Sequence, residues 1–123
     1  MTPMGLIKNY TAETLVNKKR IVSFGTSEGL VAQSVSDAGM FGVSGIRGAQ
    51  AGERLDVYLS DEQTVEYGGP INYGNYVTAD VDGRAIVAAP AVGVQMFVIG
   101  RALETGGVDV FGKILIQPQQ ITG

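Results

Sequence analysis

Five carboxylates in the middle of the chain are the side chains best suited to acid–base chemistry: Asp61, Glu62, Glu66, Asp80 and Asp82. Asp80 to Gly83 matches part of a calcium-binding loop, but the third ligand and the distal Glu of such a loop are absent. Paired carboxylates can hydrolyse glycosides, but that chemistry needs a deep aromatic-lined cleft, and the chain has no Trp. We therefore interpret these acids as turn residues and solvated strand positions.

The chain has no histidine and no cysteine. The first absence removes the commonest general base and metal ligand, and the second removes disulfides and thiolate sites. The serines have no histidine partner, so a Ser-Lys pair is the remaining hydrolytic arrangement. The sequence therefore predicts a protein that is not an enzyme, with no catalytic residue, no cofactor and no metal site.

Candidate partner-binding residues lie in the loop from residue 67 to 76, which contains three tyrosines among glycines and a proline. Tyrosine offers a large amphipathic contact with few rotatable bonds, which suits an interface. Tyr67 and Tyr73 are therefore candidate contact residues. The alternative is that Tyr67 and Tyr76 pack across neighbouring strands while the glycines make the turn.

A second candidate contact region is the N-terminal segment, residues 1 to 10, which we predict to be an extended arm. Leu6, Ile7 and Tyr10 would be unusual in a freely solvated tail, so a partner or a neighbouring subunit is expected to cover them. The alternative is a first edge strand that packs on the protein's own core.

Charge and hydropathy exclude two kinds of partner. The net charge is −3 and the isoelectric point is about 4.8, whereas phosphate binding needs a basic surface, so no nucleic-acid partner is expected. No apolar run reaches the roughly 18 residues of a membrane span, and the N-terminus does not have the pattern of a secretion signal. We expect no membrane partner and synthesis in the cytoplasm.

Alternating and turn patterns predict an all-β fold, a small β-barrel or β-sandwich. Residues 54–59 alternate apolar with polar side chains, and Asp82-Gly83 is a strong hairpin signal between strands at 77–81 and 84–87. Further strands are expected at 21–24, 30–35, 94–101 and 108–117. Glycines at 39, 42, 45 and 48 are expected at bulges and tight bends. One helical turn is expected over 11–16, with Thr11 as its cap.

These elements divide the chain into an arm (residues 1–19), a barrel-like domain (20–117) and a tail (118–123), with Pro118 ending the last strand. Eight aliphatic residues are expected to form the core: Leu55, Val57, Leu59, Val77, Ile86, Val98, Ile114 and Ile116. Several residue pairs recur 53 to 56 positions apart, such as Gly29 with Gly83. This echo indicates two similar halves, at about 20–60 and 75–116, unless any two hairpins of a small barrel look this much alike.

Short segments spread over nearly the whole chain resemble the capsid cement, or decoration, proteins of tailed bacteriophages and prophages. They are Asn9–Glu13, Arg20–Gly25, Gly42–Ser44, Ala51–Val57, Val65–Gly69, Thr78–Arg84 and Ile99–Glu104. Their order and spacing carry the resemblance, since each segment alone is mostly small and turn residues.

The resemblance implies a homotrimeric structural protein of the virion. Such proteins sit on the exterior of the capsid where major capsid subunits of the HK97 type meet, and they stabilise the shell after it expands. It also implies synthesis in the bacterial host cytoplasm from a gene beside the major capsid gene. Two alternatives remain open, a tail or baseplate β module and a surface- or carbohydrate-binding β-barrel.

Overall fold

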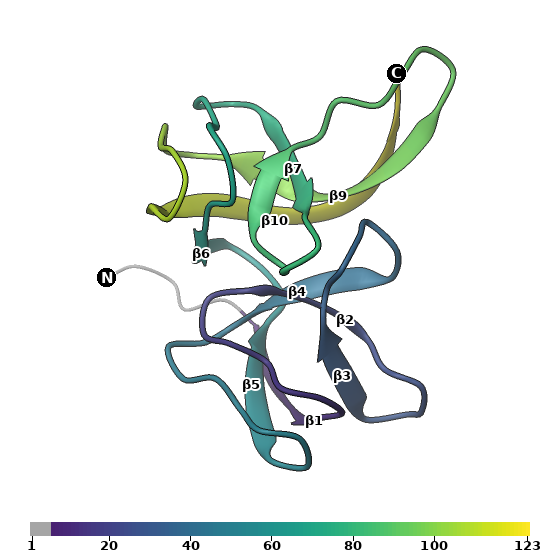
Figure 1. Ribbon diagram of the computed structural model, residues 1–123, viewed down its shortest axis with the longest axis vertical. Helices are drawn as coiled ribbons and strands as arrows, with labels where there is room; N and C mark the ends of the chain where they lie inside the picture. The colour runs from purple at the N-terminus through teal and green to yellow at the C-terminus, as the bar shows by residue number, and fades with distance from the viewer. Residues whose placement is uncertain (1–5) are drawn as a thin grey trace.

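The computed structural model describes residues 6–123, which form ten strands joined by turns, with no helix among them. A barrel and a second sheet are stacked along the long axis of the molecule (Figure 1). In chain order the strands are β1 (Ile7–Ala12), β2 (Ile21–Phe24), β3 (Leu30–Gln33), β4 (Met40–Ser44), β5 (Arg54–Tyr58), β6 (Glu62–Glu66), β7 (Tyr76–Ala79), β8 (Ala85–Val87), β9 (Gln95–Ala102) and β10 (Phe111–Thr122). The predicted all-β fold is confirmed.

The first five strands form a closed barrel in the order β1-β3-β2-β4-β5. β1 closes the barrel because it pairs antiparallel with β5 and parallel with β3. The pairing of β2 with β4 shifts register beside Gly42, where a Cβ atom would come 2.6 Å from the Val57 side chain. Gly42 thus marks a bulge, as expected for this glycine-rich stretch. The barrel interior is filled by small aliphatic residues: Ala12, Val16, Val22, Val31, Ala49, Leu55 and Val57.

The last five strands form a second sheet in the order β6-β10-β9-β7-β8. Its buried side chains form one cluster with three residues from β2 and β4 of the barrel, Ile21, Met40 and Val43. The sheet contributes Val65, Tyr67, Ile71, Val77, Ala79, Ala85, Ile99, Ala102, Ile114 and Ile116. The main core therefore lies between the barrel and the second sheet.

The two halves of the chain repeat one pairing pattern. β6 pairs with β10 as β1 pairs with β5, and the β7–β8 hairpin corresponds to the β2–β3 hairpin. The isolated bridge between Val16 and Ala49 recurs between Ile71 and Gly106. The repeat seen as an echo in the sequence is therefore a structural one, and it includes a strand before each of the expected halves.

β1 changes the interpretation of the N-terminal segment. Ile7–Ala12 lie in the barrel, so the strand alternative holds for them, while residues 1–5 lie outside the described part of the chain. The helical turn predicted over 11–16 is wrong, because Thr11 and Ala12 complete β1 and Val16 bridges to Ala49. Backbone partners on three other segments outweigh the weak helix preference of so short a stretch.

The tail predicted from residue 118 is also wrong, because β10 continues through Pro118 to Thr122 and stays paired with β9. The register shifts between Ile116 and Gln119, so Pro118 lies in a bulge where the missing N–H costs no ladder hydrogen bond. The change from barrel to sheet falls between β5 and β6, not at either predicted boundary.

The Asp82-Gly83 turn joins β7 and β8 as predicted, but the loop is longer than two residues. The Asp80 carboxylate accepts hydrogen bonds from the backbone N–H groups of Asp82 and Arg84, at 2.8 and 2.9 Å. The Gly83 carbonyl accepts one from the N–H of Ile21, at 2.7 Å, so the hairpin tip docks on the barrel. Of the predicted core, Leu59 and Ile86 are half-buried and the other six residues are buried.

Candidate interaction surface

Three aromatic side chains from β1, β2 and β4 gather at one end of the barrel core. The rings of Phe24 and Phe41 stack with centroids 4.2 Å apart, and Tyr10 meets Phe41 edge-on at 5.5 Å. Tyr10 and Phe41 pack against the barrel interior, whereas Phe24, the last residue of β2, is 67% exposed. Large exposed aromatic groups on a small domain mark a surface suited to protein contacts.

An apolar crevice of about 370 Å³ lies where this aromatic cluster meets the second sheet. Its walls are formed from the barrel side by Gly39, Met40, Phe24 and Phe41, and from β9 and β10 by Phe97, Val98, Pro118 and Gln119. Phe97 is 48% exposed. The crevice can take an apolar side chain, and it carries no charged group.

Of the predicted arm residues, Leu6 offers the most surface, at 57% exposure. Its backbone is held in place: the N–H donates to Ser60 Oγ and the carbonyl accepts from Leu59, both at 2.8 Å. Ile7 is half-buried and pairs with Tyr58 in the barrel. Tyr10 is half-buried in the aromatic cluster, so these residues are strand residues with partial surface exposure.

The two tyrosine candidates have opposite environments. Tyr67 is fully buried in the main core, and its hydroxyl donates to the Glu104 carbonyl at 2.7 Å, so it cannot contact a partner. Burial, with a smaller contribution from the charge of Glu104, raises the pKa of Tyr67. Tyr73 is 72% exposed, and its N–H donates to Thr105 Oγ1. The packing alternative is therefore correct for Tyr67, and Tyr73 is available at the surface.

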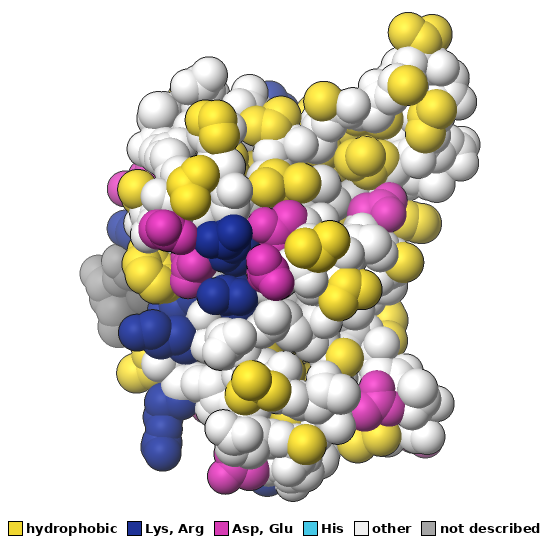
Figure 2. Space-filling model, in the orientation of Figure 1, with side chains coloured by type: hydrophobic (Ala, Val, Ile, Leu, Met, Phe, Trp, Pro, Cys, Tyr) yellow, Lys and Arg dark blue, Asp and Glu magenta, His cyan; other side chains and the backbone are white. Residues whose placement is uncertain are grey.

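A network of charged side chains joins the barrel to the second sheet, and Figure 2 shows it as a compact group of basic and acidic atoms on one face. The Glu66 carboxylate lies 3.3 Å from Arg20 and 3.6 Å from Arg84. Arg20 also donates to the Asp82 carbonyl at 2.8 Å, and Arg84 lies 2.9 Å from Asp109. The Glu66 carboxylate and the Asp82 carbonyl therefore hold the hairpin tip on the barrel through Arg20 and Arg84, and the Asp80 carboxylate shapes the tip itself.

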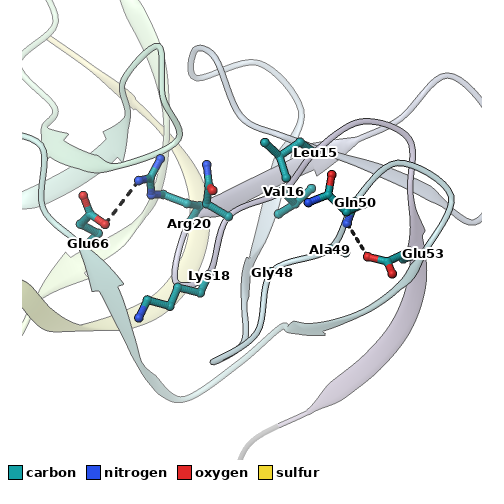
Figure 3. A pocket seen from close by; sticks show the side chains of 10 residues that line it. Leu15, Val16, Lys18, Arg20, Gly48, Ala49, Gln50, Glu53 and Glu66 are labelled. Carbon is teal, nitrogen blue, oxygen red and sulfur yellow. Dashed lines mark hydrogen bonds and ion pairs between the residues drawn. The ribbon is translucent and has the colours of Figure 1, made fainter.

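A hollow of about 460 Å³ opens beside this network (Figure 3). Arg20 and Glu66 point toward each other at one side of it, and Gln50 and Glu53 are hydrogen-bonded through the Gln50 N–H at the other. Burial lowers the pKa of Lys19, but neither Lys19 nor Tyr67 lines this hollow. The lining offers no nucleophile paired with a base, so the hollow has no catalytic arrangement.

Within residues 6–123, no three or more His, Cys, Asp or Glu side chains are placed to hold a metal ion. No helix long and apolar enough to cross a membrane occurs in the same part of the chain.

Sequence reasoning missed Phe24, Phe41 and Phe97, which lie on three strands. The signal for Phe24 was its position, because it is a large apolar residue at the end of a predicted strand, directly before Gly25. The crevice itself left no sequence pattern, because its two walls come from segments more than 50 residues apart.

Comparison with known proteins identifies a solved structure that has a similar fold. No protein-family model matches the sequence, and no curated protein sequence matches it. Among solved structures, the chain is similar to the N base of the head fiber protein gp8.5 of bacteriophage phi29. The TM-score is 0.67 at 15% sequence identity, over 91% of this chain and 93% of that one. The two chains therefore share one fold over nearly their whole lengths.

Proposed function

We propose that this protein is a structural component of a phage virion that binds the outside of the head. The observation that carries the proposal is the shared fold with the base of a phage head fiber, which spans nearly the whole of both chains. The short segments that resemble capsid decoration proteins point to the same location independently. A surface with many exposed apolar side chains agrees with a binding role.

The specific role we propose is capsid decoration by a homotrimer. A protein that binds the assembled, expanded shell and not the free subunits stabilises the shell by its binding free energy. Three copies joined in one trimer add avidity, so that each single contact can be weak. The protein would be made in the bacterial host cytoplasm and would end on the capsid exterior, with the major capsid protein as its partner.

The segment proposed to make contacts at the N-terminus is shorter than the ten-residue arm predicted from the sequence. Leu6, Ile7 and Tyr10 belong to the barrel wall or border it, and Leu6 is the most exposed of them. Residues 1–5 together with Leu6 are the segment we propose to contact the shell or the next subunit. Tyr73, exposed on the second sheet, is proposed as a separate contact.

Co-sedimentation with shells tests this proposal. The purified protein is mixed with expanded and unexpanded shells assembled from the major capsid protein encoded beside it, and binding is measured against concentration. We expect saturable binding to expanded shells and little binding to unexpanded ones. Absence of binding to either shell would contradict the proposal, and a stable monomer both in solution and on the shell would contradict the trimer.

A further inference from the structure

We propose that the outer edge of β10, from Gln117 to Thr122, binds an extended segment of the shell protein as an added β-strand. The apolar crevice beside that edge would receive one of its side chains. The inference rests on the proposed function, because it names the site and the chemistry of the shell contact. Strand addition joins backbone groups along a sheet edge, and side-chain pockets beside the edge supply specificity.

The hairpin of β9 and β10 extends beyond the rest of the second sheet and ends in a projecting tip (Figure 1). β6 covers β10 only from Phe111 to Leu115, whereas β10 continues to Thr122. Beyond the bulge, residues 119–122 pair with β9 on one side, and no strand of residues 6–123 lies on the other. Val92, at the tip, is 96% exposed.

The two edges of this hairpin differ. On the β9 edge, the Phe97 N–H donates to the Asp37 carboxylate and the Phe97 carbonyl accepts from Thr78 Oγ1, both at 2.9 Å. Phe97 is opposite Gln120, so the backbone groups of both residues point away from the shared ladder. Side chains therefore cap the β9 edge at Phe97, while on β10 the outward groups of Gln120 and Thr122 face an open side.

The open edge also has no charged residue that would oppose pairing. Proteins commonly protect exposed edges with lysines or other charges, yet residues 114–123 contain none. Pro118 blocks pairing only at the bulge and leaves the four residues after it able to pair. No charge on this edge therefore opposes pairing with an uncharged, extended segment of another chain.

The repeat shows that the aromatic wall of the crevice is not required by the fold. Phe24 in β2 corresponds to Ala79 in β7, and Tyr10 in β1 corresponds to Val65 in β6, by their places in the paired strands. Ala79 and Val65 are buried, whereas Phe24 is largely exposed. The first half therefore carries an exposed aromatic side chain, Phe24, at a position where the second half has a buried alanine.

A segment of another protein fits this site better than a second copy of the chain. A second copy that paired through the same edge would bring Gln, Pro, Gln, Gln, Ile and Thr, which are mostly polar, to an aromatic crevice. An extended segment with an apolar residue opposite the crevice satisfies both the backbone groups and the pocket.

The edge is tested by proline substitution in the full-length protein. Gln120→Pro removes an outward N–H without disturbing the β9 ladder, and Val92→Pro places a proline in the exposed turn of the same hairpin. For the crevice, Phe24→Ala is compared with Phe111→Ala, which truncates another exposed phenylalanine on β10. Binding to expanded shells is measured for all four variants, with circular dichroism to verify folding.

We expect Gln120→Pro and Phe24→Ala to bind about tenfold more weakly or worse, the scale of a truncated interface anchor. Val92→Pro and Phe111→Ala should bind as the unmodified protein does. Hydrogen exchange of the outward amides of Gln120 and Thr122 should be fast in the free protein and slow on the shell. If the first two variants bind normally while the unmodified protein binds shells, the strand-addition site is wrong and the proposed function stands.

Two other outcomes would also overturn the inference. If the unmodified protein does not bind shells, the proposed function fails and this site fails with it. If the amides of Gln120 and Thr122 are already protected in solution, in a concentration-dependent assembly that Gln120→Pro abolishes, the occupant is a second copy and not a shell segment.

Discussion

At the scale of single residues, the charged network shows what the central carboxylates do. Glu66 contacts both Arg20 and Arg84 and is largely shielded from solvent, whereas Asp109 touches Arg84 from an exposed position. Shielded ion pairs leave an uncompensated charge when one partner is removed, while exposed pairs contribute little. Two carboxylates of one network therefore differ in their contribution to stability according to their burial.

We expect Glu66→Ala to lower the free energy of unfolding by roughly 1–3 kcal/mol, because two guanidinium groups lose their common carboxylate. Asp109→Asn, which removes the charge and keeps a residue type that tolerates the left-handed backbone at this position (φ +67°), should change it by about 0.5 kcal/mol or less. Urea denaturation of both variants at low salt measures the difference. Equal losses from the two substitutions would show that burial does not set the strength of this network.

Tyr67 predicts a dependence on alkaline pH. Its pKa is raised in the folded protein, first by burial and then by Glu104, so the phenol loses its proton more readily in the unfolded chain. The corresponding stability is complete below the ordinary tyrosine pKa of about 10 and is lost as pH rises through the raised value. Tyr67→Phe should lose about 1 kcal/mol at neutral pH, from the hydrogen bond to Glu104, and should be less sensitive above pH 10.

Thermal unfolding from pH 8 to 11 checks this, with Tyr73→Phe as the control, since Tyr73 is exposed. Tyr73→Phe should follow the unmodified protein at every pH. Melting temperatures of Tyr67→Phe and the unmodified protein that fall in parallel above pH 10 would show that Tyr67 does not cause the alkaline dependence.

At the scale of elements, the β7–β8 hairpin joins the second sheet to the barrel through its tip. Gly83 has a φ of +74°, and a Cβ atom there would come 2.7 Å from the Gln33 side chain and 3.1 Å from the Ile21 carbonyl oxygen. Gly29, at the corresponding turn of the β2–β3 hairpin, has a φ of +82° and no atom within 4 Å of its Cβ position. The two glycines share a conformation but differ in crowding.

Gly29→Ala should therefore cost about 1–2 kcal/mol, the strain of a left-handed residue. Gly83→Ala should cost more, because the same strain is joined by a clash with the barrel. Chemical denaturation of both variants gives the comparison. A smaller loss at Gly83 than at Gly29 would mean that the hairpin tip does not dock on the barrel as described.

At the scale of the whole molecule, β1 decides how the N-terminus can be truncated. Ile7–Ala12 pair with both β5 and β3, so they close the barrel. Deleting residues 2–10 removes most of this strand, and we expect loss of cooperative unfolding in the barrel half. Deleting residues 2–5 leaves every described strand intact and should leave the melting temperature nearly unchanged.

Calorimetry of the two truncations tests the fold, and shell binding by the shorter truncation tests the proposed contact of the N-terminal segment. Weaker binding with an unchanged melting temperature is the expected result. Saturation of shells at the same concentration as the full chain would remove residues 1–5 from the proposed contact surface.

The fold class and the absence of histidine and cysteine chemistry could be predicted from the amino-acid sequence. Strand alternation at 54–58 and the turn at Asp82-Gly83 are local patterns, and local backbone preferences carry them into the structure. The internal echo was visible for the same reason, since matching turns need matching glycines at positive φ.

Which of the candidate contact side chains are exposed could be learned only from the arrangement of the strands. Tyr67 and Tyr73 lie in one loop, yet one is buried and the other exposed, because burial depends on strands far away in sequence. Phe24 and Phe97 meet at the crevice from different sheets, and β1 became a barrel strand through partners at residues 54–58. A β-fold is built from long-range pairings, so the positions of these side chains were set when the strands met, not by their neighbours in the chain.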